Sequence, residues 1–207
     1  MKPLELNLIK HLFVFILIWY FTSSCKNKPE TLENNLDVAS EKLEPGDIIL
    51  KCGYGFISNS IIKILQEPIS ISHCGIVCIQ HDSIFVTHSI AAEISDKDGV
   101  QTKLLNEFLL DTKPESLFIL RHKSSFTKRQ QIQKRALLYL QEKTPFDYAM
   151  DITEKSSIYC SELVFHVLND CQLKHDIKIE NIQDRPIIMF NSLINDTNNF
   201  KLIKIRN

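Results

Sequence analysis

The feature that most restricts the fold of this chain is a pair of β-rich runs, residues 72–80 and 83–90, separated by the polar pair 81–82. Runs rich in β-branched and aromatic residues on either side of a short polar pair predict a β-hairpin. A two-residue loop and a four-residue loop centred on this pair give the same register, in which His73 and His88 are diagonal neighbours on one face. A three-residue loop would separate them. The hairpin therefore predicts two adjacent histidines if its loop has an even number of residues.

Further segments extend the hairpin into a mixed domain. A turn sequence opens a β-rich run at 45–52, and the apolar spacing of 127–143 predicts an amphipathic helix in which Thr127 and Gln130 match a capping box. Strands are also expected at 117–122 and 200–205, and helices at 58–66 and from Cys160 onward. Helices and antiparallel strands in mixed order indicate an α+β fold, with an antiparallel sheet packed against helices.

Cys160 stands at the start of the most informative helical segment. An apolar stripe with helical spacing follows it, made of Leu163, Val164, Val167 and Leu168. Ser156 and Ser157 are expected to cap the helix, which places Cys160 in the first turn. The free N–H groups and the positive dipole end there lower a thiol pKa and can stabilise an oxyanion. The competing interpretation is a small buried residue on the core stripe, the usual state of a free cysteine.

His73 is the candidate general base for such a nucleophile. Gly75 stands two residues later on the same strand face, where the absence of a side chain would leave room for a substrate beside the imidazole. His88 on the facing strand would then orient the His73 ring and set its tautomer. The alternative is a pair of partly buried, hydrogen-bonded histidines without a catalytic role.

Composition and motif content argue against several other function classes. The 24 Lys and Arg nearly balance the 25 Asp and Glu, so the net charge of −1 offers no basic excess for nucleic acid. None of the familiar glycine-rich phosphate loops occurs. A zinc site is disfavoured because Cys74 and Cys78 would face one side of a strand and His73 the other, and Ser161 lacks the elbow motif of serine hydrolases. We expect no metal, no cofactor and no protein partner.

The N-terminal segment has the features of a bacterial export signal. Basic residues precede an apolar run at 12–21, which is shorter than a membrane span, and small residues lead to Cys25. We expect a signal peptide at 1–24, a lipidated Cys25 with a polar tether at 25–44, and one folded domain at 45–207. The protein would then be lipid-anchored to a membrane of the bacterial cell envelope. The alternatives are an ordinary cleaved signal and an uncleaved anchor.

The other cysteines are not expected to form a disulfide framework. If Cys25 carries lipid, five cysteines are left, and an odd number leaves at least one thiol free or paired with another molecule. A domain of this length does not depend on disulfides for its stability. The expected small buried hydrophobes are Cys52, Cys74, Cys78 and Cys171.

Five short motifs follow one another in the order PGDIIL, SHCGIV, IFVTHS, TPFDYAM and YCSELV. Together they resemble the YiiX-type, circularly permuted branch of the NlpC-like, papain-fold cysteine hydrolases, in which the histidine precedes the cysteine in the chain. The resemblance spans about 45–168. It implies that Cys160 is the nucleophile, that His73 is the base, and that His88 takes the third position, where many relatives carry Glu.

The same resemblance implies how a substrate would be held. The Cys160 N–H would donate to the oxyanion, and Tyr159 and Tyr148 would contribute to the substrate site. Phe146 stands where relatives often have a tyrosine, so the role of that hydroxyl would pass to Tyr148 or Tyr54. The family needs no cofactor.

These features lead to an exported cysteine hydrolase as the expected function. It would cleave an amide, ester or thioester bond through a Cys160 acyl-enzyme, and its substrate would be a cell-wall peptide or a lipid or acyl conjugate. Two alternatives are a module that binds a lipid or peptide without catalysis, and an acyltransferase like the lecithin:retinol acyltransferase relatives of this fold.

Lipid attachment can be tested by metabolic labelling with an alkyne fatty acid. We expect label on the wild-type protein and none on Cys25→Ser, because the thiol of that cysteine would carry the lipid. Cys52→Ser serves as the matched control and should keep the label. Absence of label on the wild-type protein, or undiminished label on Cys25→Ser, would contradict lipidation.

Overall fold

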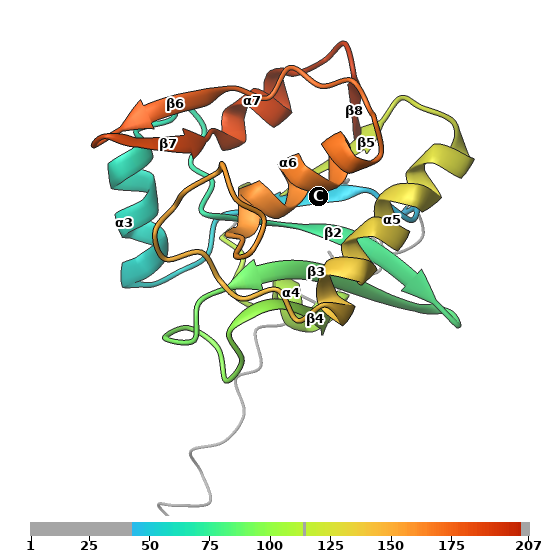
Figure 1. The fold of residues 1–207 in the computed structure, drawn as a ribbon, viewed down its shortest axis with the longest axis horizontal. Helices are drawn as coiled ribbons and strands as arrows, with labels where there is room; N and C mark the ends of the chain where they lie inside the picture. The colour runs from blue at the N-terminus through green and yellow to red at the C-terminus, as the bar shows by residue number, and fades with distance from the viewer. Residues whose placement is uncertain (1–42, 114, 204–207) are drawn as a thin grey trace, which may run out of the picture. The chain divides into compact units, whose positions relative to one another are not determined.

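The computed structural model describes residues 43–113 and 115–203, so the expected signal peptide, Cys25 and nearly all of the tether lie outside the described residues. Within those ranges an antiparallel sheet of six strands has the order β4-β3-β2-β1-β5-β8 (Figure 1). Its strands are β1 (Ile48–Lys51), β2 (His73–Gln80), β3 (Ser83–Ile90), β4 (Gly99–Leu104), β5 (Phe118–His122) and β8 (Phe200–Ile203). No helix in this part of the chain is long and apolar enough to span a bilayer.

The remaining elements are helices and one small hairpin. The helices are α3 (Phe56–Leu65), α4 (Leu105–Leu109), α5 (Phe126–Gln141), α6 (Cys160–Asp170) and α7 (Phe190–Asn195). The hairpin pairs β6 (Ile179–Ile182) with β7 (Arg185–Ile188). These elements confirm the expected α+β fold with an antiparallel sheet packed against helices.

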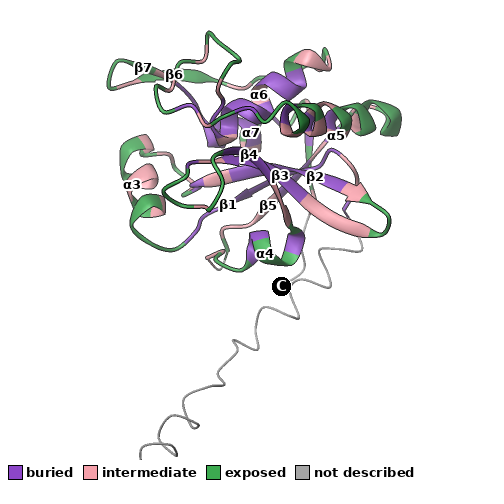
Figure 2. Ribbon diagram, turned by 60° about the horizontal axis from the view of Figure 1, so that its bottom comes forward, coloured by how far each residue is buried: buried purple, intermediate pink, exposed green. Residues whose placement is uncertain are grey.

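The sheet buries both of its faces, as the alternation of side chains along β1 shows. Ile48 and Leu50 pack into the core beneath α5 and α6, whereas Ile49 faces the opposite side with Val77 and Phe108 of α4. Figure 2 shows α5 and α6 on one side of the sheet and α4 on the other. Because successive residues of a strand point to opposite faces, both sets of side chains in β1 meet a helix layer, and Ile48, Ile49 and Leu50 are apolar in succession.

A buried ion pair ties the start of β1 to β5. The Asp47 carboxylate is fully buried and accepts hydrogen bonds from Nε and Nη2 of Arg121 at 2.8 and 2.7 Å. It also accepts from the Glu44 N–H at 2.8 Å. Gly46 before it has φ 83°, and a Cβ there would lie 2.2 Å from the Arg129 carbonyl oxygen. The expected turn at this position is thus required by both backbone angle and close packing.

The predicted hairpin has the shorter of the two possible loops. Ile76 pairs with Thr87, and Gln80 pairs with Ser83, which leaves a two-residue loop. Both loop residues, His81 and Asp82, have left-handed backbone angles, with φ 45° and 62°. This is the backbone conformation of tight hairpin turns that match the twist of the strands. The predicted register is confirmed.

The predicted caps of two helices were wrong. α5 is capped by Ser125, whose hydroxyl accepts from the Lys128 N–H, rather than by Thr127. α6 begins after Tyr159, and neither Ser156 nor Ser157 caps it. For α6 the start is set by Tyr159, whose N–H donates to Glu162 and whose hydroxyl accepts from the distant Ile188 N–H. β4, α4, the β6–β7 hairpin and α7 were not predicted at all.

The described cysteines are all free thiols. Cys52, Cys74 and Cys78 are buried as expected, whereas Cys171 is only half-buried. The difference arises because Cys171 lies at the C-terminal end of α6, where the helix leaves the core.

Asp170 at the end of α6 joins that helix to α5. Its carboxylate accepts from Arg135 Nε and the Tyr139 hydroxyl, both at 2.7 Å, and from Lys155 Nζ at 2.5 Å. Although burial raises the pKa of Asp170, the hydrogen bonds from Lys155, Tyr139 and Arg135 lower it to about 2. The ionised carboxylate therefore holds the two helices together across the same face of the sheet.

Asp170→Asn should lower the free energy of unfolding at neutral pH by about 1–3 kcal/mol, since it weakens hydrogen bonds to charged groups. Because the native pKa lies below that of an unfolded aspartate, the contribution is complete above about pH 5 and is lost toward about pH 2. Urea unfolding of both proteins across this range measures the difference. The exposed Asp96→Asn is the control, and a difference between wild type and Asp170→Asn that is independent of pH would contradict the assignment.

Candidate active site

Cys160 is the first residue of α6, the position predicted from the sequence. The N-cap residue Tyr159 has extended backbone angles, and its N–H donates to the Glu162 carboxylate at 3.1 Å. The same carboxylate is also hydrogen-bonded to His166 Nε2, at 3.0 Å. The Tyr159 hydroxyl accepts from the Ile188 N–H at 3.1 Å. These contacts determine where the helix begins, and they leave the half-buried Cys160 among the free N–H groups of the first turn.

The Cys160 thiol interacts with two side chains at the start of β2. Interaction with the Cys74 thiol holds the pKa of Cys160 well below its usual range, burial opposes this, and the hydrogen bond and charge of His73 lower it further. The pKa of Cys74 is raised, first by burial and then by its interactions with Cys160. Of the two neighbouring thiols, Cys160 is therefore the more acidic. Sequence reasoning took Cys74 only as a core residue, and its contact with Cys160 depends on how α6 packs on β2.

His73 and His88 are in direct contact, as the hairpin register predicts. His73 Nε2 and His88 Nδ1 are 2.9 Å apart, and the ring centroids are 5.0 Å apart with perpendicular planes. His73 is half-buried at the start of β2, whereas His88 is 1% exposed. Because His88 occupies Nε2 of His73, Nδ1 is the nitrogen of His73 that is left to interact with Cys160.

The hydrogen bond between the two rings has one consistent arrangement of protons. Burial lowers the pKa of His88 well below its usual value, and the charge of His73 lowers it further. A protonated His73 can only donate from Nε2, so the neutral His88 must accept at Nδ1 and carry its own proton on Nε2. The same tautomer of His88 serves when His73 is neutral and accepts the thiol proton at Nδ1. One tautomer of His88 therefore fits both protonation states of the His73 ring.

Gly75 does not leave room for a substrate, which corrects the expectation from the sequence. A Cβ at this position would lie 2.5 Å from Val86 Cγ1, 3.0 Å from the Thr87 oxygen and 3.2 Å from His88 Cβ. The neighbouring strand β3 fills the space. The missing side chain instead allows His88 to approach His73 across the strand.

The two predicted tyrosines lie in different surroundings. Tyr159 is buried, and its hydroxyl is engaged by Ile188. Tyr148 is 52% exposed and its hydroxyl donates to the Asp98 carboxylate at 2.8 Å, which joins the loop around 148 to the loop at 91–98. Among the described residues no hydrogen bond or ring contact joins Tyr148 to either histidine of the pair. Tyr54 is 59% exposed just beyond β1.

Lys51 and Phe108 are neighbours of the histidines that sequence reasoning missed. The Phe108 ring centroid lies 5.5 Å from that of His73 and 5.2 Å from that of His88. Lys51 Nζ lies 4.7 Å from the same ring centroid, and Lys51 pairs with His73 across the strands. A lysine within the apolar run IILKC was the available signal. Phe108 belongs to the unpredicted α4, and nothing local pointed to it.

Comparison with solved structures gives the fold an independent reference. The crystal structure of the metalloprotein YiiX from Escherichia coli O157:H7 superposes with a TM-score of 0.65 and 14% sequence identity, covering 79% of this chain and 97% of that one. At this identity the likeness shows the fold alone. In the part of this chain that the structure describes, no group of three or more His, Cys, Asp or Glu side chains is arranged to hold a metal ion.

One protein family matches a part of the sequence that contains both the β2–β3 hairpin and α6. No curated protein matches this chain. A family model described as "Permuted papain-like amidase enzyme, YaeF/YiiX, C92 family" matches residues 42–183. That range includes His73, His88 and Cys160. The chain therefore belongs to the YaeF/YiiX family of permuted papain-like amidases.

Proposed function

We propose that the protein is a cysteine amidase in which Cys160 is the nucleophile, His73 is the general base and acid, and His88 orients the His73 ring. The observation that carries this proposal is the 2.9 Å contact of His88 with one nitrogen of His73, whose other nitrogen is left for the Cys160 thiol. Nucleophile, base and orienting group in one chain of contacts is the arrangement that thiol hydrolases use.

The chemistry would proceed through an acyl-enzyme. The Cys160 thiolate attacks the amide carbonyl carbon, and the N–H groups at the start of α6 donate to the oxyanion that forms. His73 gives its proton to the leaving amine, and the C–N bond breaks as the thioester forms. His73 then takes a proton from water, whose oxygen attacks the thioester. The carboxylic acid leaves and the thiolate–imidazolium pair is restored.

The candidate substrates are cell-wall peptides and lipid or acyl conjugates, and surface composition supports the second class. β1 ends at Lys51, which pairs with His73, and exposed apolar side chains follow directly. Tyr54, Phe56 and Ile57 are 59%, 85% and 42% exposed. Exposed apolar side chains close together in sequence, three to six residues after the strand end that pairs with His73, are suited to binding a hydrocarbon chain. We therefore propose an N-acyl amide as the substrate class, placed in the cell envelope by the expected lipid anchor.

Cys160 should be the fastest thiol to react with iodoacetamide at neutral pH, by roughly tenfold or more, because the thiolate is the reacting species. Burial raises the pKa of Cys78 to about 11 and also raises the pKa of Cys171. Peptide mapping of the adducts over time gives the order of reaction. Cys160→Ala is the control and should lose the fast phase only. Faster modification of any other cysteine would contradict the nucleophile assignment.

His73 and His88 should respond unequally to substitution. His73→Ala should lower kcat/KM for an N-acyl amide by about 10²–10⁴-fold, since it removes proton transfer. His88→Ala should cost on the order of tenfold, because it affects the ring alignment of His73 and not the reacting atoms. Steady-state kinetics with product analysis by mass spectrometry decides this, with circular dichroism as the test of folding. Unchanged turnover in both variants would leave a binding module as the better interpretation.

A further inference from the structure

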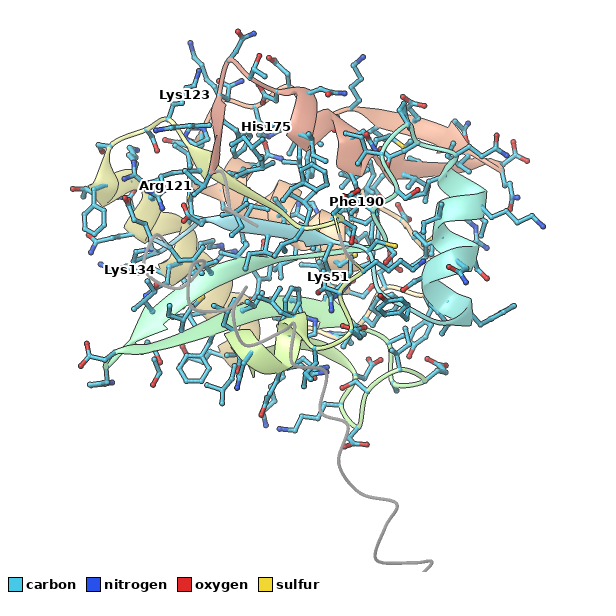
Figure 3. All side chains as sticks on the ribbon, turned by 180° about the vertical axis from the view of Figure 1, so that it is seen from behind. Lys51, Arg121, Lys123, Lys134, His175 and Phe190 are labelled. Carbon is cyan, nitrogen blue, oxygen red and sulfur yellow. The ribbon has the colours of Figure 1, made fainter. Side chains whose placement is uncertain are left out.

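A row of polar side chains crosses the sheet on the face that packs against α4. Lys51 of β1 lies directly opposite His73 of β2, so both point to this face. His88 of β3 shares the face as the diagonal neighbour of His73. Lys103 of β4 lies opposite Val86, two residues before His88, and therefore also belongs to this face. Figure 3, which labels Lys51, views the molecule from this side.

The ammonium group of Lys51 is buried, which is unusual for a lysine. Its side chain is 6% exposed, and the ammonium group donates to the Phe108 carbonyl and to the Asp111 carboxylate. The Asp111 side chain is 61% exposed, so the counter-charge sits at the rim while the ammonium group lies inside. Burial lowers the pKa of Lys51, and Asp111 raises it. A buried ammonium is costly even when it is hydrogen-bonded, which suggests a role for the charge beyond packing.

The charged groups around His88 are all positive or can become so. His73 faces it from β2, Lys51 from β1 and Lys103 from β4, while α4 presents the uncharged Phe108 ring. The acidic residue beyond α4, Asp111, pairs with Lys51. His88 Nε2 is buried and has no hydrogen-bond partner among the described atoms. Nothing in this surrounding would stabilise a second proton on His88.

The chemistry of Cys160 requires that His88 stay uncharged. When the thiol proton moves to His73 Nδ1, His73 is an imidazolium whose Nε2–H donates to His88 Nδ1. A proton on His88 Nδ1 would turn this hydrogen bond into two opposed N–H groups on two cations. The His73 ring would then turn away from His88, and its Nδ1 would no longer be held toward Cys160.

We propose that Lys51 and Lys103 are positioning residues whose charges act together with the burial of His88 to keep it an uncharged hydrogen-bond acceptor, so that the proton from Cys160 is held on His73 alone. The inference rests on the proposed function, in which His73 exchanges that proton. Only one proton moves in this step, from Sγ of Cys160 to Nδ1 of His73. The protons on His73 Nε2 and His88 Nε2 stay where they are. The lysines touch no reacting atom and act only through His88.

The state of His88 can be read directly from long-range ¹H–¹⁵N spectra of ¹⁵N-histidine-labelled full-length protein, from about pH 8 to about pH 5. In wild type we expect His88 to be neutral and protonated on Nε2 throughout. In Lys51→Met and in Lys103→Met, removal of a positive charge should raise the pKa of His88, so that its signals titrate within this range. Lys103 is half-buried, so its variant tests the charge effect even if Lys51→Met does not fold.

Two further variants separate charge from packing. Lys51→Arg keeps the charge and should keep His88 neutral, as should Lys134→Met on the exposed side of α5, which removes a charge remote from the pair. A His88 that does not titrate in either Lys51→Met or Lys103→Met overturns the proposal. So does a wild-type His88 that is already charged or protonated on Nδ1.

Alkylation of Cys160 supplies a second readout that needs no substrate. The ratio of rates at about pH 5.5 and about pH 7.5 should fall roughly tenfold from wild type to Lys51→Met, the factor that corresponds to one pKa unit. An unchanged ratio in a variant whose His88 titrates would overturn the coupling to Cys160. If Cys160 is unreactive in wild type while His88 responds as stated, the proposed amidase function fails, whereas the effect of the lysines on His88 stands.

Discussion

The register of the β2–β3 hairpin is the constraint on which the candidate site depends. Its two-residue turn, with left-handed backbone at His81 and Asp82, places His73 and His88 diagonally on the same face. A slip of one residue would move one histidine to the other face and abolish the 2.9 Å contact. Gly75 makes the contact possible, because any side chain there would collide with β3. The two rings therefore meet because of a turn several residues away.

A second, independent feature brings Cys160 to this pair: α6 packs on the opposite face of the sheet. The apolar stripe of α6 is buried in the core with Cys74 of β2, and the carboxylate of Glu162 receives the N-cap N–H. The helix thereby presents its first residue to the start of β2, where Cys74 and His73 act on the thiol. The candidate nucleophile and its candidate base thus come from elements that are far apart in sequence and are brought together by the packing of α6 on β2.

Two residues of the same type differ in their surroundings at this site, once for the cysteines and once for the histidines. Of two neighbouring thiols, the fully buried Cys74 has a raised pKa and Cys160 a lowered one. Of two neighbouring histidines, the buried His88 is surrounded by positive charge, while His73 is half-exposed and faces the thiol. Burial and nearby charge, rather than residue type, thus distinguish the two thiols from each other and the two histidines from each other.

Local pattern in the sequence was sufficient for the hairpin, the long helix α5, the place of Cys160 at a helix start and the pairing of the two histidines, because strand alternation and helical spacing are short-range properties. The family motifs added the permuted order of histidine and cysteine. Only the tertiary structure decided that Cys74 touches Cys160, that Gly75 serves β3 rather than a substrate, and that Lys51 and Phe108 border the histidine pair. These depend on which strands lie side by side and on how α4 and α6 cover the two faces. Such long-range packing is not encoded in any short window of the chain.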